Sequence, residues 1–156
     1  MIKKFAEFIK ESAEWTSTST DDVNEQDVIK FLKIVANWDD SRDNRKLKSA
    51  FGEAKALLIT GNTTKYSPII NKILGGVSIF VNNAIAAKSK QLAQFGNKYR
   101  SEILIFDDAP VFQGDDCEGL NALLDSSNGF VIINTDSSYR EIKKKFPEIA
   151  DKVFAI

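Results

Sequence analysis

Polar residues that could bind Mg²⁺ or phosphate follow three apolar runs of this chain. The run 102–106 is followed by Asp107 and Asp108, and the run 129–133 by Asn134, Thr135 and Asp136. The run 56–59 is followed by Thr60, Gly61 and Lys65. Carboxylates are preferred ligands of Mg²⁺, and α/β proteins commonly bind ligands at the carboxyl ends of their buried strands. The spacing therefore predicts a polyphosphate site where three strand ends meet.

The phosphate end of such a site is expected after the first of these runs. Ser67 followed by Pro68 is typical of a helix start, and a helix amino terminus presents free N–H groups and a positive dipole end. Lys65 lies two positions earlier and could neutralise a phosphate bound there. Adjacent residues of a strand face opposite sides, so the sequence leaves open whether Asp107 or Asp108 points into the site.

The composition is that of a folded protein without histidine chemistry. The chain has 156 residues, of which 43% are hydrophobic and 28% charged, with a net charge of −1. Near-neutral charge argues against broad coating of nucleic acid, which is not an expected partner. With no histidine and one cysteine, Cys117, the chain excludes Ser-His-Asp and Cys-His catalysis and an internal disulfide. No apolar run approaches the roughly 18 residues of a membrane span, and a cytoplasmic, reducing location is expected.

Apolar periodicity predicts helices first and an alternation of strands and helices afterwards. Helices are expected at 2–15, from Asp22 or Asn24 to Trp38, and at 45–53, with a polar linker at 16–20. Strands are expected at 55–60, 77–81, 102–106, 129–134 and 152–156. The helices between them are expected to begin at Ser67, at Asn82 or Asn83 (ending at Gly96), at Asp115 or Asp116, and at Ser138.

This alternation is typical of crossover connections in a parallel sheet. Continuous apolar strands also fit a sheet that is buried on both faces. We therefore expect an α/β protein with a three-layer, Rossmann-like unit of about five mainly parallel strands at 55–156. Residues 1–54 are expected to form a helical extension of this unit.

In its order of elements, the segment from about 55 to 156 resembles the core of the P-loop NTPases, in particular the helicase-like and AAA-like branch. The run 103–106 with Asp107 and Asp108 looks like the Walker B strand, whose acids organise Mg²⁺ and water. Asn134 or Thr135 looks like the residue that senses the γ-phosphate. The resemblance implies Mg²⁺ and a nucleoside triphosphate as ligands.

The same resemblance gives each candidate residue a role. The implied roles are phosphate binding for Gly61, Lys65 and Ser67, Mg²⁺ binding for Asp107 and Asp108, and catalysis for Asp108 and Asn134. The phosphate loop departs from the family pattern G-x-x-x-x-G-K-[ST], because Gly61 lies four positions before Lys65 instead of six, and Thr64 replaces the second glycine. A nucleotide- or polyphosphate-binding protein with weak or no turnover is therefore expected, at most a Mg²⁺-dependent NTPase.

Three other interpretations compete for the same residues. Acids at 107–108, 115–116 and 136 are compatible with a two-metal nuclease, although the first strand ends without an acid. Arg140 and the lysines at 143–145 could contact phosphate backbones, but a solvated helix face explains them more simply. The polar strand ends could also be no more than capped turns of a Rossmann-like scaffold.

The first dozen residues carry a second resemblance. The amphipathic stretch 1–12 is similar to the leader of internal head proteins of tailed phages, which a prohead protease removes after a glutamate. Ile9-Lys10-Glu11 fits that cut site, with cleavage after Glu11. The resemblance implies a phage origin and a place in the host cytoplasm or the phage particle. It supports an alternative function, in which a non-enzymatic phage protein contacts a host or virion protein through the loop 107–116 or the helical extension.

Overall fold

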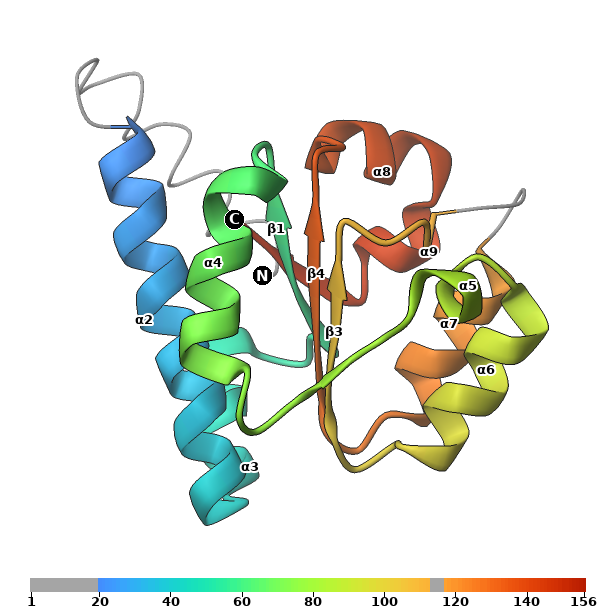
Figure 1. The fold of residues 1–156 in the computed structure, drawn as a ribbon, viewed down its shortest axis with the longest axis horizontal. Helices are drawn as coiled ribbons and strands as arrows, with labels where there is room; N and C mark the ends of the chain where they lie inside the picture. Colours follow the sequence, from blue (N-terminus) through green and yellow to red (C-terminus); the bar gives the residue numbers. More distant parts are fainter. Residues whose placement is uncertain (1–19, 113–116) are drawn as a thin grey trace.

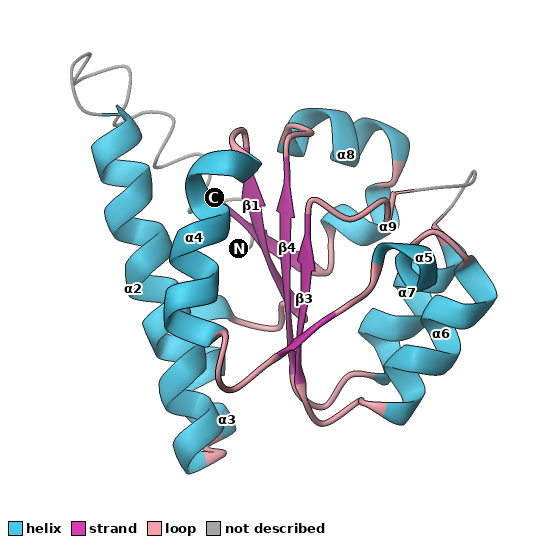
Figure 2. Ribbon diagram, viewed as in Figure 1, coloured by secondary structure: helices cyan, strands magenta, loops and turns pink. Residues whose placement is uncertain are grey.

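The computed structural model describes residues 20–112 and 117–156. Two helices, α2 (Thr20–Ser41) and α3 (Asn44–Phe51), precede the first strand. The strands are β1 (Ala56–Thr60), β2 (Ile79–Phe80), β3 (Ile103–Asp107), β4 (Phe130–Thr135) and β5 (Val153–Ala155). The helices between them are α4 (Thr63–Leu74), α5 (Asn83–Ala86), α6 (Ser89–Lys98), α7 (Glu118–Ser126), α8 (Tyr139–Lys145) and α9 (Pro147–Ala150) (Figure 1, Figure 2).

The five strands form one parallel sheet in the order β2-β3-β4-β1-β5. β4 lies between β1 and β3 and pairs with both (Figure 1). The two central strands, β1 and β4, are apolar runs buried along almost their whole length, as expected for a sheet covered on both faces. The predicted α/β class with five parallel strands is confirmed.

Helices cover both faces of the sheet and give the molecule three layers (Figure 1). On one face, here called the α4 face, α2, α3 and α4 pack against strand residues such as Leu57, Ile105 and Ile132. On the other, the α7 face, α5 to α9 pack against the alternate residues, such as Leu58 and Leu104. The two-residue period of a strand produces this division. α2 and α3 thus share a hydrophobic core with the sheet.

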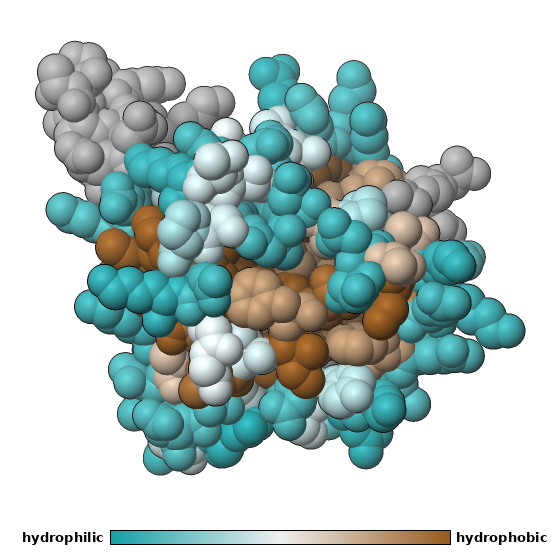
Figure 3. All heavy atoms as spheres, viewed as in Figure 1, coloured by the Kyte–Doolittle hydropathy of each residue, from teal (hydrophilic) through white to brown (hydrophobic). Residues whose placement is uncertain are grey.

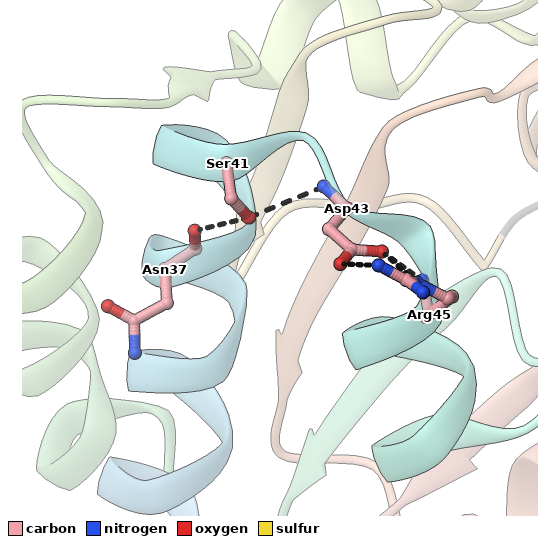
Figure 4. A network of polar contacts seen from close by, with 4 residues as sticks. All are labelled: Asn37, Ser41, Asp43 and Arg45. Carbon is pink, nitrogen blue, oxygen red and sulfur yellow. Dashed lines mark hydrogen bonds and ion pairs between the residues drawn. The ribbon is translucent and has the colours of Figure 1, made fainter.

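A short polar network joins α2 to α3 (Figure 4). The Ser41 hydroxyl donates to the carbonyl of Asn37 (3.2 Å) and accepts from the N–H of Asp43 (3.3 Å). Asp43 then caps α3, because its carboxylate accepts the N–H of Arg45 (3.0 Å). The Arg45 guanidinium also bonds this carboxylate, which lowers the pKa of Asp43 below its ordinary value. The network ends one helix and starts the next within three residues.

The helix after β1 begins one turn earlier than the sequence indicates. α4 starts at Thr63 behind the N-cap Asn62, whose side chain accepts a backbone N–H of the first turn (3.0 Å). The prediction of a cap at Ser67 is therefore wrong, and Pro68 lies inside the helix. Asparagine is among the strongest N-caps, and the carbonyl that loses its partner at Pro68 belongs to an exposed residue, Thr64.

Other boundaries differ for local reasons. The single helix expected after Asn82 is two helices, α5, capped by Asn82, and α6. Gly96 lies within α6 instead of ending it, because the missing side chain lets α6 approach Leu123 of α7. β2 pairs over two residues rather than the five of 77–81. The expected start of α8 at Ser138 matches within one residue, and Ser138 is the N-cap of the helix.

Several expectations fall on residues outside the described part of the chain. They are the helix at 2–15, the cap at Asp115 or Asp116, and the linker at 16–20 except Thr20, which opens α2. Within residues 20–112 and 117–156, every helix is too short or too polar to cross a membrane.

Candidate functional site

The carboxyl ends of β1, β4 and β3 lie side by side at the same end of the parallel sheet. The connection after β1 runs over the α4 face, whereas the connection after β4 runs over the α7 face (Figure 1). Neighbouring strands whose connections leave in opposite directions form a crevice, and α/β proteins commonly bind ligands there. The three polar strand ends of the sequence analysis meet at this position.

Asp107, at the end of β3, forms the centre of a polar cluster. Its Oδ2 accepts a hydrogen bond from the hydroxyl of Ser67 on α4, and its Oδ1 accepts one from Nδ2 of Asn134 (2.9 Å). Asp107 and Asn134 are partners in the sheet register, and the alternation along β3 places Asp107 on the α4 face. We call Ser67, Asp107 and Asn134 the strand-end cluster.

Asn134 is the buried member of the strand-end cluster, with only 1% of its surface exposed. Its Nδ2 donates to Asp107 and to the carbonyl of Thr63 (3.2 Å). Because both partners are acceptors, the orientation of the amide is fixed. Oδ1 is buried and accepts no hydrogen bond from any residue that the structure describes. A buried acceptor without a donor costs about 1–3 kcal/mol, so this oxygen would gain from a bound ligand or water.

Protein groups already occupy the amino terminus of α4. The N–H of Thr63 donates to Oδ1 of Asp136 (2.9 Å), and the N–H of Lys65 donates to the N-cap Asn62 (3.0 Å). Asp136 is exposed and follows β4, so its carboxylate brings negative charge to the positive end of the helix dipole. A phosphate that bound at this helix end would compete with Asp136 for the N–H of Thr63.

Two of the predicted phosphate ligands lie outside the strand-end cluster. Lys65 extends toward α2, where its Nζ is 3.9 Å from a carboxylate oxygen of Glu25. Gly61 has a φ of +99°, in the region that favours glycine, and its N–H donates to the carbonyl of Thr135 (3.1 Å). Gly61 therefore turns the chain from β1 toward α4.

Asp108 takes a different position from its neighbour Asp107. It is exposed, its φ is +55°, and its N–H donates to the carbonyl of Asn134 (2.8 Å). The left-handed conformation starts the loop that follows β3. Of the two adjacent acids, Asp107 belongs to the strand-end cluster and Asp108 to the exposed loop.

The strand-end cluster offers a carboxylate, a hydroxyl and an amide oxygen as candidate metal ligands. Residues 20–112 and 117–156 contain no group of three or more acidic, cysteine or histidine side chains placed to hold a metal ion. The described chain thus lacks the converging acids of a two-metal nuclease. Mg²⁺, in contrast, is commonly bound by one or two carboxylates together with waters and ligand phosphates. The cluster has the donors for that second kind of site.

Sequence reasoning missed two residues of this region, Asn62 and Thr63. The signal for Asn62 was present, because an asparagine immediately before a helical stretch is a typical N-cap. Thr63 contributes only its backbone to Asn134 and Asp136, and no sequence pattern indicates such contacts. The basic residues Arg140 and 143–145 are exposed on α8, which begins four residues after the end of β4, and no hydrogen bond or ion pair joins them to the strand-end cluster among the contacts described above.

Comparison with known proteins provides no relative from which a function could be transferred. No family model, no curated protein and no solved structure matches the chain. The resemblances to P-loop NTPases and to phage leaders therefore stay predictions. The leader with its cut site after Glu11 and part of the loop 107–116 lie outside the described residues.

Proposed function

We propose that this chain binds the Mg²⁺ complex of a nucleotide or another polyphosphate at the strand-end cluster, with little or no turnover. The observation that carries the proposal is the contact of Ser67 and Asn134 with the two carboxylate oxygens of Asp107. Three segments that are far apart in the sequence supply these groups, at the crevice where α/β proteins commonly bind ligands.

The pairing of Ser67 with Asp107 supports Mg²⁺ as the ion. In P-loop NTPases, Mg²⁺ is held by a Ser or Thr at the start of the helix after the phosphate loop and by an acid at the end of another strand. Ser67 lies in the second turn of α4 and Asp107 ends β3, so this pair joins the same two kinds of element. The buried Oδ1 of Asn134 adds an acceptor that could bind a water of the ion's hydration shell.

The connection between β1 and α4 supports binding without efficient turnover. β1 ends at Thr60 and α4 begins at Thr63, so the turn is too short to surround a β-phosphate as a P-loop does. The Nζ of Lys65 lies 3.9 Å from a carboxylate oxygen of Glu25 on α2, so part of its charge is already balanced by an acid. Phosphoryl transfer relies on positive groups that stabilise the charge of the transition state, and this arrangement provides few of them.

Thermal unfolding with and without millimolar Mg-ATP, Mg-ADP, Mg-GTP and Mg-pyrophosphate tests the proposal. A ligand at a hundredfold excess over its dissociation constant stabilises the native state by about 2.7 kcal/mol, which raises the unfolding midpoint. We expect a rise that requires Mg²⁺ and that Asp107→Asn abolishes. Asp108→Asn is the matched control, because it removes the same charge from the exposed neighbour and should keep the rise.

Two outcomes would contradict the proposal. One is an unchanged midpoint of the wild-type chain with all four ligands. The other is an equal Mg²⁺-dependent rise in the Asp107→Asn variant, which would place the ligand elsewhere. A rise with release of phosphate at rates typical of enzymes would keep the site and overturn the expected lack of turnover.

A further inference from the structure

One edge of the sheet is formed by β2, which pairs with β3 alone. The N–H of Val81 donates to the carbonyl of Ile105 on β3 (2.9 Å). Backbone groups of successive strand residues point to opposite sides, so the N–H and C=O of Phe80 point to the outer edge. In Figure 2 the short strand β2 crosses the front of the sheet, and no helix lies in front of it. Among the described elements, the outer side of β2 thus has no strand paired with it.

Nothing in the sequence around β2 protects this edge by charge. The stretch 73–87 contains no Asp, Glu, Lys, Arg or Pro, in a chain of which 28% is charged. Exposed edge strands usually carry a charge, a proline or a bulge that discourages pairing with another chain. Only the shortness of β2 limits pairing here. An uncharged edge of this kind favours contact with a second strand.

Apolar side chains surround the same edge. Phe80 is 39% exposed. Among the residues that the structure describes, it is the one large hydrophobic residue that is exposed. Val77, Ile79 and Ile85, its neighbours along the chain, are half-buried, with Val77 on the α4 face and the two isoleucines on the α7 face. Figure 3 shows a brown area in the middle of the face that β2 crosses in Figure 2, with hydrophilic residues around it. A contiguous apolar area with a polar rim is typical of a protein–protein contact.

We infer that β2 is a self-association edge, at which two copies of this chain pair their β2 strands antiparallel around a two-fold axis. The outward N–H and C=O groups are a template for an extended backbone, and a second copy supplies one. A two-fold contact places the same patch on both sides, and a patch without charges meets its own copy without like-charge repulsion. The two five-stranded sheets would become one continuous sheet, with Phe80 of each copy near the axis.

The strand-end cluster is not part of this contact. Asp107 lies at the carboxyl end of β3, whereas the contact uses the outer side of β2 and the residues beside it. Self-association is therefore independent of the proposed ligand, and each can fail without the other.

Sedimentation velocity of the full chain, over nanomolar to high micromolar concentrations, tests the inference. We expect a species of twice the chain mass of 17.4 kDa at micromolar concentration. Phe80→Pro should give a monomer, because it removes an N–H that β2 uses only toward the second copy. Phe80→Lys should also give a monomer, since it places like charges on both sides of the axis. Phe80→Tyr, the matched control, keeps the ring and the N–H and should stay a dimer.

Circular dichroism of each variant shows whether it is folded. Phe80 is partly exposed, so Phe80→Lys should keep the fold even if Phe80→Pro does not, and it then decides the test alone. A wild-type chain that stays monomeric throughout the concentration range would overturn the inference, and β2 would then be an edge for another protein or for none. A folded Phe80→Lys variant that dimerises as strongly as the wild type would overturn it as well.

Discussion

On the α4 face of the sheet, phenylalanine rings fill the space under the helices, whereas on the α7 face glycine lets two helices touch. The ring of Phe51 has its centroid 5.3 Å from that of Phe31, 4.8 Å from that of Phe130 and 5.4 Å from that of Phe154. These residues come from α2, α3, β4 and β5. The rings thus join α2 and α3 to the central strand β4 and the edge strand β5.

On the α7 face, rings form two separate pairs, Phe95 with Tyr99 and Phe112 with Phe146. A Cβ built on Gly96 of α6 would lie 2.6 Å from Cγ of Leu123 on α7, much closer than two carbon atoms pack. The space under α2 and α3 is therefore filled by a cluster of rings, whereas the contact between α6 and α7 depends on close approach of the helices. Removing volume should harm the first face, and adding volume should harm the second.

The largest effect in this comparison is expected for Phe51→Ala. Phe51 is 2% exposed, and its loss would leave a cavity among three other rings. Substitutions of this kind lower the free energy of unfolding by about 3–5 kcal/mol. Guanidinium unfolding followed by circular dichroism measures the change. Phe80→Ala is the control on an exposed phenylalanine, and a loss for Phe51→Ala as small as for this control would contradict the role of the ring cluster.

A smaller loss is expected for Gly96→Ala on the other face. The added methyl group must displace Leu123, and overpacking of this kind costs about 1–3 kcal/mol. Gly76→Ala is the matched control, since a Cβ at Gly76 meets no atom within 4 Å and its φ lies outside the left-handed region. The same unfolding experiment compares them. Equal midpoints for the two variants would show that the α6–α7 contact tolerates volume.

The smallest change in stability is expected for Asp136→Asn at the polar end of the α4 face. The substitution removes a charge from the amino terminus of α4, which is worth about 0.3–1 kcal/mol. It should also strengthen any binding of Mg-ATP, because a neutral amide oxygen competes less strongly than a carboxylate for the N–H of Thr63. Thermal shift with Mg-ATP measures both effects, and Asp151→Asn serves as a control for loss of an exposed acid. If Mg-ATP raises the unfolding midpoint of Asp136→Asn by less than that of Asp151→Asn, Asp136 contributes to ligand binding and does not compete with the ligand.

The sequence predicted the buried parts of the fold well. The expected strands at 55–60, 102–106 and 129–134 match β1, β3 and β4 within one residue at each end. Continuous apolar runs produce this success, since a strand buried on both faces leaves no polar residue inside it. The class and the parallel arrangement followed from the same runs and the helices between them.

The candidate site was harder to predict, because it depends on strand order. The contact of Ser67 with Asp107 joins residues 40 positions apart, and it exists only because β4 alone separates β1 from β3. No periodicity of the sequence encodes that order. The start of α4 was predicted wrongly for a local reason. Ser67 followed by Pro68 is a strong sequence signal for the start of a helix, but the side chain of Asn62 makes the cap.

The place of β1 in the sheet also affects how the chain is made. β1 pairs with β4 and β5, and both are translated long after it. Early helices can form while the nascent chain leaves the ribosome, but β1 has no partner strand until the last part of the chain emerges. Through most of translation, Ala56–Thr60 is therefore an unpaired apolar strand. This segment is where a holding chaperone would bind the unfinished chain.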